Sequence, residues 1–243
     1  RYDGSVTTDI GMAGGSFQTA TGLRSSTIQF TNSRGDVAGV AQAYDETGTA
    51  SRVALWFNDG LTTRQVSPLF DDPTLDGARY SAVQLTDSGL LIGYRELFQA
   101  RSALYTHVFV WDSHASPGQE RTDILIGALG RSDALNDIQF ISGQHDMVIG
   151  TYRNLGMNNR QTGFYVWARG LGTFDLDSLV GTELFNQTGI SSLSYLDSEF
   201  TGSYSFVDTA DGVVMTIENH DRAGGLRTNQ LLINPAAVPE PAS

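Results

Sequence analysis

The residues best able to do chemistry in this chain are carboxylates. The stretch FDDPTLDG (70–77) places Asp71, Asp72 and Asp76 in one loop. Carboxylate oxygens are the hard ligands that Ca²⁺ prefers, so this loop is a candidate calcium site, and Ca²⁺ is the one cofactor we expect. The spacing departs from the regular EF-hand pattern, and aspartate is also a common turn residue. An ordinary polar turn is the alternative.

A second arrangement that would suit catalysis is a pair of glutamates. Glu96 and Glu218 lie near the ends of comparable predicted strands, and glycoside hydrolysis needs two carboxyl groups about 5–10 Å apart. The rest of the inventory is poor. The four histidines show no paired-ligand spacing, no Gly-x-Ser-x-Gly sequence occurs, and the chain has neither Cys nor Lys. We therefore expect no catalytic residues, and we expect that the protein is not an enzyme.

The charge balance argues against one class of partner. Acidic residues number 27 and basic residues 15, giving a net charge of −12. Proteins that bind the phosphate backbone usually carry a basic stripe, so nucleic acid is not expected as a partner.

The elements that must position any site are repeated β-hairpins. Each of four segments has an alternating strand, a polar turn and a second apolar run, and a third strand follows each hairpin. The hairpins lie at residues 29–40, 84–94, 139–151 and 205–217, and the third strands at 52–56, 107–111, 163–167 and 229–233. These third strands carry residues expected to pack between repeats: Trp56, Trp111, Trp167 and Ile233.

A fourth strand follows in three of the repeats, at residues 62–66, 121–125 and 173–177, but not in the last. A matching segment, VTTDIG (6–11), stands before the first repeat. Ring-shaped propellers commonly close by such a permutation, which protects the terminal edges. We predict one all-β domain over residues 1–237, a four-bladed β-propeller-like fold. Its repeats lie at about 24–70, 78–127, 135–180 and 188–234, and strand 4–11 completes the last blade.

The completing strand has two possible acceptors. Residues Val6, Thr7, Thr8, Asp9 and Ile10 enter either the last blade of their own chain or that of a neighbouring copy. Entry into a neighbour is strand donation, which links subunits into a homo-oligomer or fibre.

Two resemblances bear on where the protein works. The segments TNSRGDVAG, VALW and TDIG resemble short extracellular repeats of the propeller type, and VPEPAS (238–243) resembles the start of a PEP-CTERM sorting signal. The motif positions are Val238, Pro239, Glu240, Pro241 and Ala242. The resemblance implies export by a Gram-negative bacterium and a hydrophobic C-terminal helix, removed by an exosortase, that contacts the membrane only transiently. It also implies association with exopolysaccharide and biofilm matrix.

The sequence therefore favours a secreted structural or matrix protein that assembles with itself, with surface polysaccharide, or with both. The alternative is an extracellular carbohydrate-binding module that uses exposed aromatic residues such as Tyr94, Tyr105 or Tyr195. The tripeptide RGD (34–36) falls where the other repeats have polar turns, and we interpret it as a turn rather than an adhesion motif.

Overall fold

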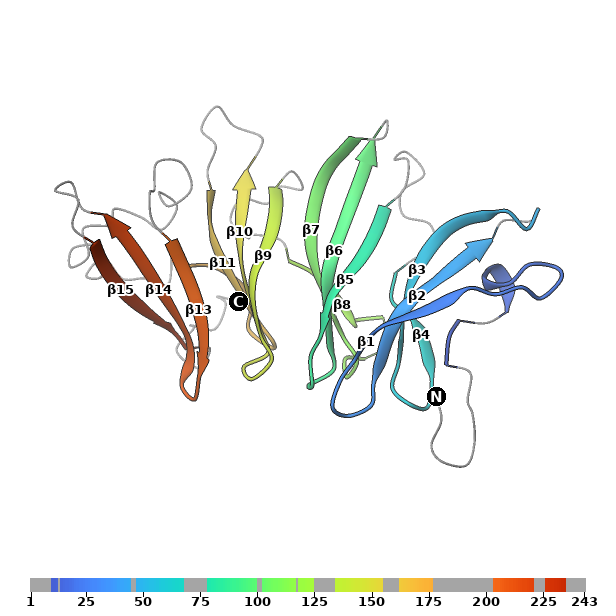
Figure 1. Ribbon diagram of the computed structural model, residues 1–243, viewed down its shortest axis with the longest axis horizontal. Coiled ribbons are helices and arrows are strands. Elements are labelled where there is room, and N and C mark those ends of the chain that lie inside the picture. The colour runs from blue at the N-terminus through green and yellow to red at the C-terminus, as the bar shows by residue number, and fades with distance from the viewer. Residues whose placement is uncertain are drawn as a thin grey trace. The chain divides into compact units, whose positions relative to one another are not determined.

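The chain divides into two compact units, Arg1–Asp123 and Ile124–Ser243. The computed structural model (Figure 1) describes residues 10–12, 14–44, 47–67, 78–99, 102–116, 118–124, 134–154, 162–176, 203–220 and 226–234. Within them the elements are β-strands and one 3-10 helix, η1 (Gly15–Phe17). Among these residues, no helix is long and apolar enough to cross a membrane.

The first unit contains two four-stranded antiparallel sheets. The first sheet has the order β1-β2-β3-β4 and the second has the order β5-β6-β7-β8 (Figure 1). The strands of the first sheet are β1 (Ser26–Thr31), β2 (Val37–Tyr44), β3 (Ala50–Asn58) and β4 (Thr63–Gln65). Those of the second are β5 (Ala78–Leu85), β6 (Leu90–Gln99), β7 (Ser102–Asp112) and β8 (Arg121–Asp123).

The second unit contains a four-stranded sheet, β9-β10-β11-β12, and a three-stranded sheet, β13-β14-β15. The strands of the third sheet are β9 (Ala134–Ser142), β10 (Met147–Asn154), β11 (Thr162–Ala168) and β12 (Gly172–Asp175). Those of the fourth are β13 (Ser203–Thr209), β14 (Gly212–His220) and β15 (Leu226–Ile233). The prediction of an all-β chain built from repeated sheets is thus confirmed, and the sheets do not close into a barrel.

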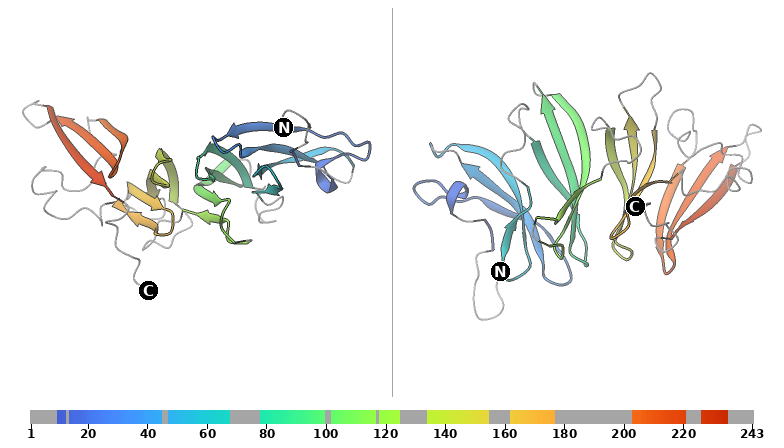
Figure 2. Two further views of the ribbon diagram at one scale, coloured as in Figure 1. Left: turned by 90° about the horizontal axis from the view of Figure 1, so that it is seen from below. Right: turned by 180° about the vertical axis from the view of Figure 1, so that it is seen from behind.

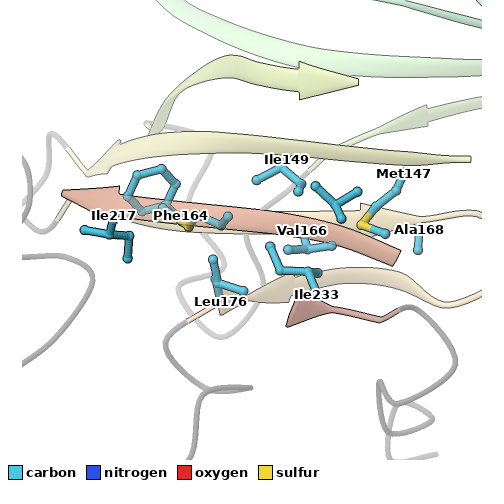
Figure 3. Close-up of a cluster of buried hydrophobic side chains, with 10 residues drawn as sticks. Met147, Ile149, Phe164, Val166, Ala168, Leu176, Ile217 and Ile233 are labelled. Atoms are coloured by element: carbon cyan, nitrogen blue, oxygen red, sulfur yellow. The ribbon is translucent and has the colours of Figure 1, made fainter. Parts of the chain in front are cut away.

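Each unit is held together by side chains that pack between its two sheets, which lie beside each other in both views of Figure 2. In the first unit, Leu55 and Phe57 of β3 pack against Leu91 and Trp111 of the second sheet. The core of the second unit is drawn in Figure 3, and it joins β10, β11 and Leu176 to β14 and β15. Alternating apolar residues on neighbouring strands produce both cores, because successive side chains of a strand point to opposite faces.

Each of the first three sheets has a glycine on its second strand, which is β2, β6 or β10 and is called the central strand below. Gly39, Gly93 and Gly150 each pair with an aromatic residue of the third strand, which is Trp56, Phe109 and Tyr165 respectively. A Cβ added at each glycine would meet both that ring and a backbone carbonyl of the first strand. The pairing of the first strand shifts by one residue at the same point. Glycine therefore allows the close approach that these β-bulges require.

The strand register separates the tryptophans that the sequence spacing treated as equivalent. Trp111 and Trp167 each pair with the residue two places before the central glycine, whereas Trp56 pairs with the glycine itself. Trp56, Trp111, Trp167 and Ile233 are all buried. The spacings of 55 and 56 residues (111 − 56 and 167 − 111) thus arise from positions that differ by two residues in the first sheet.

Candidate functional site

The open edge of β15 is the candidate functional site. Among the described residues, β15 has β14 as its only neighbour, whereas the third strand of each other sheet also pairs with an outer strand. An unpaired edge presents a row of backbone N–H and C=O groups that a further strand can use. β15 contains no proline, a residue that commonly discourages strand addition, and it ends in the apolar run LLI (231–233).

The other three sheets show what a fourth strand looks like at this edge. β4, β8 and β12 are short strands of three or four residues. A buried aliphatic residue follows each of them directly, namely Val66, Ile124 and Leu176. Val66 and Leu176 belong to the clusters that join their sheet to the next sheet in the same unit. The outer strand and the residue after it thus connect one sheet to its successor.

Ile10 has the same character as these three residues. It is only 7% exposed and packs with Phe17 of η1 and with Val37 and Trp56 of the first sheet. Its carbonyl oxygen accepts a hydrogen bond of 2.8 Å from the Thr63 hydroxyl. The Ile124 carbonyl similarly accepts one of 2.8 Å from Asn136 Nδ2 on the following sheet. Ile10 therefore ends the matching N-terminal segment as an aliphatic residue packed against a sheet.

The fourth sheet also carries an exposed aliphatic row. Val207, Val214 and Leu232 pair directly across its three strands. Their neighbours Phe206, Met215 and Leu231 point to the other face and pack toward the third sheet. Val207 is 58% exposed and Leu232 is 49% exposed. An aliphatic row across a whole sheet is a feature of faces that another element covers.

The RGD turn of the first unit has its aspartate buried and hydrogen-bonded within the protein. The Asp36 carboxylate is buried, and it accepts hydrogen bonds from Arg34 Nη2 at 2.9 Å and from Asn32 Nδ2 at 2.8 Å. Asn32 Nδ2 also donates to the Thr86 carbonyl at 2.9 Å. The aspartate of the tripeptide therefore holds the β1–β2 turn together and is not available to an outside partner.

The same turn is fixed to the neighbouring sheet. The Ser33 backbone N–H donates to Asp87 Oδ1 at 2.8 Å, and this hydrogen bond lowers the pKa of Asp87. Arg34 Nη1 lies 3.0 Å from His114 Nε2. These contacts tie the β1–β2 turn to the β5–β6 turn and to the loop after β7, so the polar side chains at this end serve the packing of the first unit.

The two glutamates considered for catalysis lie in different units. Glu96 is on β6 and pairs in register with Arg79 and Thr106. Glu218 is on β14, where it accepts a hydrogen bond of 3.2 Å from the Ser203 hydroxyl.

Three of the histidines are buried or contact other residues of the fold. His107 is buried on β7, His114 contacts Arg34, and His145 Nε2 donates to the Thr209 carbonyl at 2.7 Å. Within the described ranges, no group of three or more His, Cys, Asp or Glu side chains is placed to hold a metal ion.

Several predicted residues lie outside the part of the chain that the structure describes. They are the calcium candidates Asp71, Asp72 and Asp76, the strand residues Val6, Thr7, Thr8 and Asp9, the sorting motif Val238–Ala242, and Tyr195. Tyr94 lies half-buried on β6, and β7 includes Tyr105. Calcium binding and sorting stay predictions. Sequence reasoning predicted that the last repeat lacks a fourth strand, but of the residues on β15 it singled out only Ile233, as a packing residue.

Comparison with known proteins adds little to this site. No protein-family model matches the chain, and no curated protein matches it. A crystal structure of a mutant of AofleA from Arthrobotrys oligospora aligns with a TM-score of 0.33 and 13% sequence identity. The alignment covers 91% of this chain and 64% of that chain, so this chain spans less than two thirds of its length. A likeness at this level carries no argument about function.

Proposed function

We propose that this protein is a secreted structural component of the cell surface or extracellular matrix that assembles with its own copies by strand donation. One observation carries the proposal: within the described residues, the fourth sheet has three strands where each of the other three sheets has four. The N-terminal sequence VTTDI resembles RTDI (121–124), which is the outer strand of the second sheet together with the residue that follows it.

Strand donation satisfies the needs of both partners. The acceptor gains hydrogen bonds along the open edge of β15, and the donor segment gains a sheet to join. With this strand added, all four sheets have four strands, as in a four-bladed propeller-like arrangement. Because the donated strand comes from the first unit and its acceptor is in the second, exchange between copies leaves every contact within each unit unchanged. Exchange of an identical element is a low-cost route to oligomers.

The C-terminal segment and the composition support the proposed extracellular setting. The segment VPEPAS resembles a sorting signal of exported bacterial proteins, and a net charge of −12 with no cysteine suits a soluble matrix component that needs no disulfides. A structural role also agrees with polar clusters whose hydrogen bonds hold turns in place, such as the one around Asp36.

Negative-stain electron microscopy and light scattering of the purified protein test this proposal. A deletion of residues 1–9 is the sharpest truncation, because it keeps Ile10, which is buried on the first sheet. Thr8→Pro removes one backbone N–H from the donated strand, and Thr8→Ser is the matched control that keeps it. We expect filaments or large oligomers for the parent protein and for Thr8→Ser, and their loss in Thr8→Pro and in the deletion. Parent particles of single-chain mass at all concentrations would refute self-assembly.

A further inference from the structure

The outer strands of the complete sheets share one register. The last residue of each stands opposite the aromatic residue of the third strand that pairs with the central glycine. These pairs are Gln65 with Trp56, Asp123 with Phe109, and Asp175 with Tyr165. The buried aliphatic residue follows directly in every case. The register of an added strand is therefore defined once the equivalent position on β15 is known.

Packing and pairing locate that position at Leu231. Leu91 and Val213 are each the second residue of a central strand, and each packs toward the preceding sheet. Leu91 pairs with Trp111, and Val213 pairs with Ile233. The aromatic Phe109 lies two residues before Trp111. The corresponding residue two places before Ile233 is Leu231.

A polar contact accompanies the last residue of the outer strand in two sheets. Asp123 Oδ2 accepts from Arg95 Nη1 at 3.3 Å, and Asp175 Oδ2 accepts from the Tyr152 hydroxyl at 2.8 Å. Both donors lie on the central strand, two residues after its glycine. The carboxylate of the outer strand thus receives a hydrogen bond from the sheet that it completes.

The fourth sheet has a donor without an acceptor at the same place. The residue in the position of Arg95 and Tyr152 is Ile217, which has no polar side-chain atom, and it pairs with Asn229 of β15. Asn229 Nδ2 is buried and has no hydrogen-bond partner in the described structure. A buried donor of this kind ordinarily has an acceptor, so the open edge lacks a group that can accept a hydrogen bond beside Asn229.

We propose that residues 7–9 of a second copy fill the edge of β15 in this register. Thr7 pairs with Ile233, Thr8 with Leu232 and Asp9 with Leu231, and the Asp9 carboxylate accepts the hydrogen bond from Asn229 Nδ2. The sequence TTDI (7–10) then matches RTDI (121–124) at three of four positions, including the aspartate and the aliphatic residue that follows it. The inference rests on the proposed function for the origin of the strand in a second copy.

The anchoring of Ile10 also accounts for the exposed row on the fourth sheet. Ile10 directly follows the donated residues and is held on the donor's first sheet by Val37 and Trp56. The acceptor's fourth sheet is therefore brought to the donor's first sheet. The acceptor's aliphatic row of Val207, Val214 and Leu232 is then available to pack against the donor's first sheet. Thr8 of the donor, which pairs with Leu232, extends this row by one residue.

Cysteine cross-linking tests the register, because the chain has no cysteine of its own. Directly paired residues of antiparallel strands have Cα separations of about 4.5–5.5 Å, which fall within the range that disulfides span. A Thr8→Cys chain mixed with a Leu232→Cys chain is expected to give disulfide-linked heterodimers on a non-reducing gel. The matched control pairs Thr8→Cys with Leu231→Cys, whose side chain points to the other face, and should give none.

The outcomes separate the register from the assembly. No heterodimer in a mixture that still forms filaments would overturn the register while leaving self-assembly intact. In a chain carrying both Thr8→Cys and Leu232→Cys, a cross-link confined to single chains would overturn donation by a second copy, and with it the proposed assembly.

The contact between Asp9 and Asn229 has its own test. Asp9→Ala is expected to raise the critical concentration for assembly about ten- to hundredfold, because it removes a hydrogen bond to a charged acceptor. Exchanging the two groups, as Asp9→Asn with Asn229→Asp, should restore most of the loss. An unchanged critical concentration in Asp9→Ala would overturn the assigned contact.

Discussion

Replacing Gly150 with alanine tests the close approach of strands that the first three sheets share. A Cβ at this position would lie within contact distance of the Asp137 carbonyl oxygen and 2.5 Å from Cζ of Tyr165. The carbonyl belongs to the backbone of β9, so it moves only if the bulge opposite Gly150 changes. The Tyr165 hydroxyl donates to that same carbonyl at 3.2 Å, and the substitution disturbs this hydrogen bond as well.

Three terms set the size of the effect. Overpacking a close contact costs about 1–3 kcal/mol. Losing the hydrogen bond between Tyr165 and Asp137 costs about 0.5–1.5 kcal/mol. Replacing glycine with alanine returns about 0.4–1 kcal/mol by restricting the unfolded chain. Gly150→Ala should therefore lower the free energy of unfolding of the second unit by about 2 kcal/mol.

Urea unfolding followed by circular dichroism and fluorescence measures this loss. Gly143→Ala is the matched control, because its added Cβ meets no atom within 4 Å and its backbone does not have a positive φ. The control should leave stability unchanged or raise it slightly. A loss below about 0.5 kcal/mol in Gly150→Ala, with the control unchanged, would refute the view that the sheet geometry requires glycine here.

Three further predictions concern packing and charge. Leu176→Ala should cost about 2–5 kcal/mol in urea unfolding, because the side chain fills the core of the second unit (Figure 3), whereas Leu61→Ala, at 93% exposure, should change little. Asp36→Ala should lower the thermal midpoint of the first unit by removing about 1.5–3 kcal/mol, because the buried carboxylate accepts hydrogen bonds from a neighbouring arginine and asparagine. Burial alone would raise the pKa of Asp59. Hydrogen bonds from Thr62 and from the Leu61 backbone, together with the positive charge of Arg64, outweigh this effect and leave the pKa below 3.8. Stability from Asp59 is present above that pH and is lost as the pH falls through the lowered pKa. Urea midpoints between about pH 5 and 2 should therefore fall less steeply in Asp59→Asn than in the parent, and identical slopes would contradict this assignment.

Strand exchange at the edge of β15 connects these packing rules to assembly. The three complete sheets show that an outer strand is short and draws part of its stability from the aliphatic residue that follows it. A strand of three residues contributes few hydrogen bonds. Ile10 is already buried on the donor's first sheet, so it fixes where the donated strand leaves that sheet, and the binding itself depends on the acceptor edge.

The sequence alone was enough to predict that the chain is all-β and built from four repeated sheets. Alternating apolar residues between polar turns define strands by local rules, and the absence of a fourth strand in the last repeat is visible in the printed sequence. The same rules could not assign equivalent positions. Trp56 differs by two residues from Trp111 and Trp167 because strand register depends on turn length and on bulges, which residue spacing does not report.

Only the tertiary structure decided which polar groups have partners. The sequence showed the RGD tripeptide but not the burial of Asp36, which depends on residues brought together by the fold. It likewise showed an asparagine in the last strand but not that Asn229 Nδ2 is buried without an acceptor among the described residues. Sequence determines the elements because their periodicity is local, whereas burial and hydrogen bonding depend on which surfaces pack together, and this is settled by folding.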